Sequence, residues 1–84
     1  MNCRVLYFAR LRERFDLAEE SVALAGTPSV TDLIAHLQVR GGVWAEELGA
    51  TKRFRVAVNQ ALVQTDAAIP DGAEVAIFPP VTGG

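Results

Sequence analysis

A single amphipathic helix among short β-prone runs is the feature that most constrains the fold of this chain. Its apolar stripe has the i, i+3, i+4, i+7 spacing of one helix face and consists of Val30, Leu33, Ile34 and Leu37. Ser29 can cap the N-terminus of this helix, and Asp32, three residues later, makes a weaker version of the capping box. The chain has 84 residues, enough for one core, so the β-prone runs have to bury this stripe.

Apolar or alternating runs on both sides of the helix predict short strands. These runs cover residues 5–9, 20–24, 54–58, 61–63 and 74–78. Gly41-Gly42 predicts the end of the helix, and Asn59-Gln60 predicts a reversal between two strands. Residues 10–15 are polar and predict a turn, whereas residues 43–48 predict a second short helical piece.

The order of these elements, β-β-α-β-β-β, predicts an α+β fold with a hairpin on each side of one main helix. A mixed sheet with that helix packed on one face buries the pattern compactly, and this is the β-grasp, or ubiquitin-like, architecture. The sequence has no linker, internal repeat or low-complexity tract. We therefore expect a single domain over residues 1–84, with residues 79–84 as a flexible tail.

The composition argues against several function classes. The formal net charge of -2 gives no strong basic field, so we expect neither a nucleic-acid nor a membrane partner. Cys3 is the single cysteine, which excludes an internal disulfide and suits a reducing compartment. The sequence shows no secretory signal and no apolar run of ~20 residues, so we expect a cytoplasmic protein. His36 is the single histidine, and we expect no metal site and no bound cofactor.

The last six residues carry most of the functional information: Pro79-Pro80-Val81-Thr82-Gly83-Gly84. The prolines end the last strand and favour an extended backbone, the β-branched pair prolongs it, and the glycines remove all side-chain bulk. Six extended residues at ~3.3–3.6 Å each span about 20 Å. Such an end suits a partner enzyme that draws a terminal carboxylate into a narrow pocket; a frayed terminus is the alternative.

Strand alternation predicts an exposed apolar surface on the sheet. If Val5 and Tyr7 face the helix, Phe8 faces the other way, and the same alternation directs Phe78 outward. Exposed apolar patches usually mark partner sites, so these two phenylalanines are candidate docking residues. The alternative is that they are ordinary core residues.

Charged residues gather in two basic clusters and one acidic pair. The basic clusters, which either steer an acidic partner or form a solvated rim, are Arg10, Arg12 and Arg14, and Lys52, Arg53 and Arg55. Glu46 and Glu47 are adjacent on the predicted short helix, where neighbouring residues do not face each other. We expect both on the surface.

Two segments resemble the small subunit of molybdopterin synthase, the MoaD family. They are Ala57-Val58-Asn59-Gln60 and Asp71-Gly72-Ala73-Glu74-Val75-Ala76-Ile77-Phe78-Pro79-Pro80-Val81-Thr82-Gly83-Gly84. Residues 5–13 also resemble the first strand and turn of that family. The resemblance implies that Gly84, preceded by Gly83, is the working residue. Its carboxylate is adenylated, becomes a thiocarboxylate, and gives sulfur to a pterin precursor in molybdenum cofactor biosynthesis.

The resemblance also implies the partners. The large synthase subunit would join the chain in a heterotetramer, and an adenylating, E1-like enzyme would charge it, so Gly84 carries AMP and then sulfur. Leu62 matches a position that packs against the large subunit in the family. The implied partner-binding residues are Phe8, Leu62, Phe78, Pro79, Pro80, Val81 and Thr82. The sequence has no Gly-x-x-x-x-Gly-Lys phosphate loop, so the ATP chemistry would come from the partner. In the implied cycle the carrier is consumed and recharged, so it would be a cosubstrate rather than an enzyme.

Two other functions fit the same tail. One is a sulfur carrier for thiamine thiazole synthesis, which shares the terminal chemistry but has a different acceptor. The other is a ubiquitin-like modifier that forms isopeptide bonds.

Overall fold

Five strands form one mixed sheet in the computed structural model, which describes residues 1–49 and 53–79. The elements in chain order are β1 (Asn2–Tyr7), α1 (Ala9–Phe15), β2 (Glu19–Ala23), α2 (Val30–Gln38), α3 (Val43–Glu47), β3 (Arg55–Val58), β4 (Ala61–Leu62) and β5 (Glu74–Phe78). The strand order across the sheet is β2-β1-β5-β3-β4. The central pair, β1 and β5, is parallel, and the other pairs are antiparallel. This arrangement confirms the predicted α+β, β-grasp fold.

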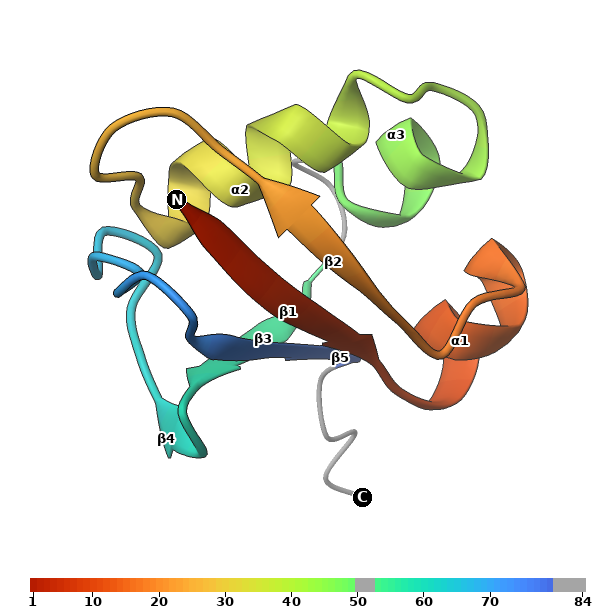
Figure 1. The fold of residues 1–84 in the computed structure, drawn as a ribbon. Coiled ribbons are helices and arrows are strands. Elements are labelled where there is room, and N and C mark those ends of the chain that lie inside the picture. Colours follow the sequence, from red (N-terminus) through yellow and green to blue (C-terminus); the bar gives the residue numbers. More distant parts are fainter. Residues whose placement is uncertain (50–52, 80–84) are drawn as a thin grey trace.

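The main helix, α2, packs on one face of the sheet (Figure 1). The four residues of its apolar stripe are all buried, as its spacing predicts. The Ser29 side chain accepts a hydrogen bond from the Asp32 backbone N–H, and the Asp32 carboxylate accepts one from the Ser29 backbone N–H. The predicted capping box is therefore present. The helix ends at Gln38, earlier than the Gly41-Gly42 pair that was predicted to end it.

Residues 10–15 were predicted as a turn, and this prediction is wrong: Ala9–Phe15 form the helix α1. The reason is the i, i+4 pair Leu11 and Phe15, whose side chains are buried on one side of this helix. Apart from Ala9, the remaining side chains are charged and exposed, which hid the helical pattern. Asp16 ends the helix with a left-handed backbone, and its N–H donates to the carbonyl oxygens of Arg12 and Glu13.

The other element boundaries differ from the predicted ones by one to three residues. Strand β1 covers Asn2–Tyr7 rather than the predicted residues 5–9, because Phe8 caps α1 and Ala9 begins it. Strand β2 lies one residue earlier than predicted, β3 begins at Arg55 rather than Phe54, and β4 ends at Leu62. The short helix α3 ends at Glu47, one residue before the predicted end. No helix within the described part of the chain is long and apolar enough to cross a membrane.

Candidate functional site

The sheet face opposite α2 carries a row of apolar side chains that crosses four strands. The row follows from the strand register, in which Leu6 pairs with Ala76, Ala76 with Ala57, and Ala57 with Leu62. The neighbouring row points the other way and is buried: Tyr7 pairs with Ile77, and Ile77 with Val56. Alternation thus separates an inner, packed face from an outer one. Leu62 is 68% exposed at the edge of the outer face.

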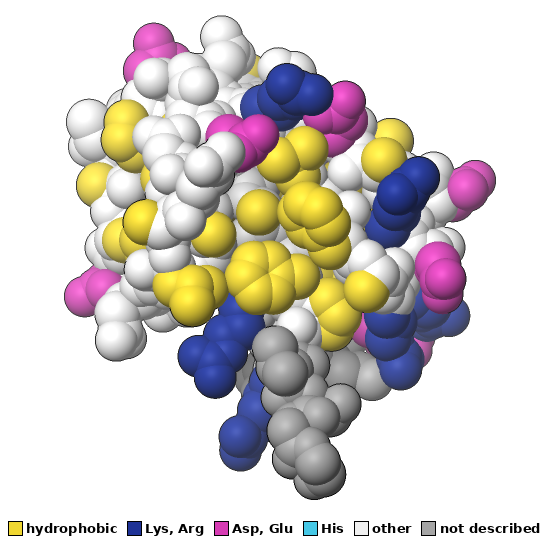
Figure 2. Space-filling model, turned by 90° about the horizontal axis from the view of Figure 1, so that it is seen from below, with side chains coloured by type: hydrophobic (Ala, Val, Ile, Leu, Met, Phe, Trp, Pro, Cys, Tyr) yellow, Lys and Arg dark blue, Asp and Glu magenta, His cyan; other side chains and the backbone are white. Residues whose placement is uncertain are grey.

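Phe8 and Phe78 extend this outer row at the end of β5. Their rings meet edge to face with centroids 6.5 Å apart, and the Phe8 N–H donates to the Ile77 carbonyl oxygen at 3.2 Å. Phe8 is 47% exposed and Phe78 is half-buried. We define the apolar patch as Leu6, Phe8, Ala57, Leu62, Ala76 and Phe78. Figure 2 shows hydrophobic side chains gathered over this face of the molecule.

The expected outward position of Phe8 and Phe78 is confirmed, and neither they nor Leu62 belong to the buried core cluster. A fully buried aromatic or leucine would stabilise the fold, whereas these side chains leave apolar area in contact with water. Their role in binding a partner stays a prediction.

A tight reversal fixes Leu62 at the edge of the apolar patch. Asn59 and Gln60 connect β3 to β4 with left-handed backbones, at φ values of 49° and 72°. Two successive positive φ values suit a two-residue hairpin, because the twist of such a turn matches that of the strands. The Asn59 side chain also accepts a hydrogen bond from the Glu74 N–H at 3.0 Å, which ties the reversal to β5.

The terminal residues follow directly from the strand that carries Phe78. Pro79 is half-buried, and it is the last residue that the structure describes. The predicted sites at Pro80, Val81, Thr82, Gly83 and Gly84 lie outside the described residues. The patch and the tail are therefore neighbours in sequence, because Phe78 belongs to one and the next residue begins the other.

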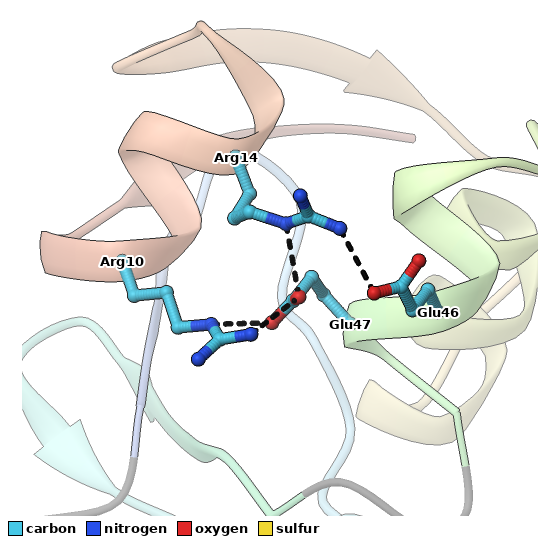
Figure 3. Close-up of polar contacts among 4 residues, drawn as sticks. All are labelled: Arg10, Arg14, Glu46 and Glu47. Atoms are coloured by element: carbon cyan, nitrogen blue, oxygen red, sulfur yellow. Dashed lines mark hydrogen bonds and ion pairs between the residues drawn. The ribbon is translucent and has the colours of Figure 1, made fainter.

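An ion-pair cluster joins α1 to α3, and it corrects the expectation for the acidic pair (Figure 3). Glu47 is only 4% exposed, so its predicted surface position is wrong. Arg10 donates from Nε to Glu47 Oε1 at 3.1 Å, and Arg14 donates from Nε to Glu47 Oε2 at 3.1 Å. Arg14 also donates to Glu46 at 2.9 Å. Two members of the first basic cluster therefore hold helices together, because i, i+4 residues on α1 share one face.

A second polar cluster lies between β1, β2 and the turn that follows α2, and no local sequence pattern predicts it. Tyr7 donates to Glu20 at 2.6 Å, and Arg40 donates two hydrogen bonds to the same carboxylate. The hydrogen bonds from Arg40 hold the pKa of Glu20 below its ordinary value, whereas burial raises the pKa of Tyr7. Arg40 also lies over the Trp44 ring, which stacks on Phe15 at 3.8 Å. This cluster supports the core rather than forming a site.

Three arginines of the basic clusters make no ion pair with another described residue: Arg12, Arg53 and Arg55. Cys3 is buried, and burial raises the pKa of its thiol. His36 is exposed on α2. Among residues 1–49 and 53–79, no group of three or more histidine, cysteine, aspartate or glutamate side chains could hold a metal ion.

Comparisons with known proteins match nearly the whole chain. The model of the ThiS family matches residues 5–84. The molybdopterin synthase sulfur carrier subunit of Escherichia coli K12 is 44% identical over 81 residues, which cover 96% of this chain and 98% of that protein. A putative molybdopterin converting factor, subunit 1, from Pyrococcus furiosus superposes with a TM-score of 0.83 at 32% identity, covering 96% of this chain and 99% of that one.

Another similar structure is a complex of two proteins. It is the complex of subunits 1 and 2 of the molybdopterin-converting factor from Helicobacter pylori 26695. The matched chain superposes with a TM-score of 0.70 at 25% identity and is covered completely, as is the present chain.

Proposed function

Because this chain belongs to the ThiS family, we propose that it is the sulfur carrier subunit of a molybdopterin synthase and that Gly84 carries the sulfur. The observation that carries this proposal is the 44% identity to the E. coli sulfur carrier subunit across 98% of that protein's length. The family match includes residue 84. A single carrier domain over residues 1–84, ending in the tail 79–84, is part of the proposal.

The chemistry starts from a carboxylate that has to be activated. With a pKa of about 3.5 the α-carboxyl of Gly84 is an anion at neutral pH and a poor electrophile. Its oxygen attacks the α-phosphorus of ATP in an adenylating enzyme, and pyrophosphate leaves. The outer sulfur of a persulfide on a donor protein then attacks the acyl carbon, and AMP departs with the electron pair of the broken C–O bond. A thiol attacks the donor's sulfur in the resulting acyl disulfide, so the S–S bond breaks, a new disulfide forms on the donor and the acyl sulfur leaves with the electron pair. The product is the thiocarboxylate of Gly84.

Discharge returns Gly84 to its starting state. The thiocarboxylate sulfur is a soft nucleophile that attacks a carbon of the pterin precursor in the active site of the large subunit, and a C–O bond of the precursor breaks, with its oxygen leaving with the electron pair. Water then cleaves the acyl C–S bond, which leaves the carboxylate on Gly84 and the sulfur on the pterin. The chain is consumed and recharged in this cycle, so it acts as a cosubstrate and both enzymes supply the catalytic groups. It binds no resident cofactor.

The partners in this cycle are an E1-like adenylating enzyme and the large synthase subunit, with the latter in a heterotetramer of two small and two large subunits. The H. pylori structure supports a large-subunit partner, because it is a complex of subunits 1 and 2 of the molybdopterin-converting factor. We place the cycle in the cytoplasm, where a reducing environment preserves reactive sulfur.

The sheet and the tail contact the partner in different ways. Phe8, Leu62 and Phe78 of the apolar patch pack against the partner, because they expose apolar area on one face. Pro79, Pro80, Val81 and Thr82 then lead the diglycine end into the partner's pocket.

Intact-protein mass spectrometry tests the terminal chemistry. The chain is incubated with an adenylating enzyme of the family, ATP and a sulfur source, beside a variant that lacks Gly84. We expect a mass gain equal to sulfur minus oxygen in the full chain and no gain in the truncated one. Attachment to lysine side chains in place of this gain would identify a ubiquitin-like modifier.

Adding the large synthase subunit and the pterin precursor to the charged chain separates the two sulfur-carrier functions. Loss of the extra mass together with formation of molybdopterin supports the proposal. A charged chain that keeps its sulfur in this mixture would favour another acceptor, such as the thiazole precursor of thiamine.

A further inference from the structure

We propose that the partner surface that receives the tail is acidic where it faces Arg53 and Arg55, and that these two arginines accelerate docking. This inference rests on the proposed function, because it names the electrostatic character of the partner at the same surface.

The strand register places both arginines at the tail end of the apolar patch. Arg55 pairs with Phe78 across β3 and β5, and both side chains point away from the core. Phe54 packs against the core, and the residues before and after it, Arg53 and Arg55, are both exposed. The two cations therefore lie at the start of β3 and just before it, where β3 runs beside the end of β5.

The fold leaves these charges available while it neutralises other arginines. Arg4, Arg10, Arg14 and Arg40 each form an ion pair with a carboxylate. Arg53 and Arg55 make no ion pair with any residue in 1–49 or 53–79. Lysine and arginine side chains border the hydrophobic surface in Figure 2.

The opposite end of the same face is more acidic. Arg4 lies there but forms an ion pair with Glu19. Glu74 begins β5 and points outward, and the exposed Asp71 precedes it in the turn. Four residues of strand at ~3.3 Å each place the Glu74 position about 13 Å from the Arg55 position. The face is thus polarised along β5, with Arg55 at the end where the strand reaches Phe78.

An acidic protein surface is the occupant that this polarity fits. Exposed arginines add little to affinity, because water and salt screen them. They act instead on association, since complementary charges raise encounter rates and orient the two proteins. A cation at the Phe78 end of the patch attracts an acidic part of the partner toward β3, so the two proteins meet in one preferred orientation. The net charge of -2 argues against nucleic acid as the occupant.

Stopped-flow association with the large synthase subunit tests this inference. We expect the double variant Arg53→Glu/Arg55→Glu to associate about ten-fold more slowly at low salt, with a dissociation rate within about two-fold of the original. The difference should vanish near 1 M salt, where the Debye length is about 3 Å. Arg55→Gln is the milder variant, and its matched control is Arg4→Gln, which removes one positive charge from the other end of the same face.

The outcomes separate this inference from the proposed function. The acidic-partner inference is overturned if the double variant associates at the original rate. It is also overturned if Arg4→Gln slows association as much as Arg55→Gln does. Either result leaves the carrier function standing. Thermal unfolding of each variant shows whether it is folded. If the double variant has lost its melting transition, the comparison of Arg55→Gln with Arg4→Gln decides. If the unaltered chain fails to bind the large subunit at all, the proposed function itself is overturned.

Discussion

Gln60 holds a backbone conformation that glycine adopts more readily. Its φ of 72° is left-handed, which costs a residue with a side chain about 1–2 kcal/mol, while glycine adds about 0.5–1 kcal/mol of chain entropy to the unfolded state. We therefore expect Gln60→Gly to raise the free energy of unfolding by up to about 1 kcal/mol, or several degrees in Tm. Urea and thermal unfolding measure this change.

Gly72 provides the control with the opposite sign. It has a φ of +80°, and an added Cβ would meet no atom within 4 Å, so Gly72→Ala changes conformational preference without a clash. We expect it to lower stability by about 1 kcal/mol. A loss of stability in both variants would show that the Gln60 side chain contributes more than its backbone conformation costs.

Glu20 makes stability depend on pH. The hydrogen bonds from Arg40 lower its folded pKa below the ordinary value of 4.5, so the folded state favours the charged form. This contribution is complete above about pH 4.5 and is lost as the pH falls through the folded pKa. We expect Glu20→Gln to be less stable at pH 7 and to lose less stability on acidification, as measured by urea unfolding from pH 7 to 3. Glu19→Gln removes one exposed carboxylate from the same strand, so it is the control at pH 7, where it should change stability by less than about 1 kcal/mol.

Elements with a local periodic pattern were predictable, and contacts between distant segments were not. The stripe of α2 and the alternation of β5 are both visible in a few neighbouring residues, so the sequence predicts them and the outward side of Phe78. The helix α1 has only two buried apolar residues, Leu11 and Phe15, and their burial depends on contacts with distant segments of the chain. The burial of Glu47 likewise depends on Arg10, 37 residues away in the chain, and no local pattern encodes that contact.

The α1–α3 junction depends on one buried carboxylate. Removing the Glu47 side chain deletes the acceptor of both Arg10 and Arg14. Because the two arginines are partly exposed, water can solvate them again, so the loss should be about 1–3 kcal/mol rather than that of a fully buried pair. We expect Glu47→Ala to lose this amount in urea unfolding. Glu46→Gln, at an exposed position on the same helix, should lose less than about 1 kcal/mol, and an equal loss in both would contradict the role of burial.

At the scale of the whole molecule, the sheet assigns stability and recognition to opposite faces. Successive residues of a strand point to opposite sides, so Ile77 packs in the core while Ala76 and Phe78 contribute to the apolar patch. One layer of helices covers the inner face and leaves the outer face uncovered within the described residues (Figure 1). We therefore expect exposed residues of the apolar patch to tolerate substitution with little effect on folding.

A pair of alanine variants tests this separation. Leu62 is 68% exposed, so Leu62→Ala should change the free energy of unfolding by no more than about 0.5 kcal/mol. The same variant should bind the large subunit at least about ten-fold more weakly, because it truncates an apolar side chain of the docking surface. Ile77→Ala, at a fully buried position, should lose about 2–5 kcal/mol of stability and keep its affinity at temperatures where it stays folded. Calorimetric titration and urea unfolding of both variants measure the two quantities. Full affinity in Leu62→Ala would remove Leu62 from the docking surface while leaving the sulfur chemistry of Gly84 intact.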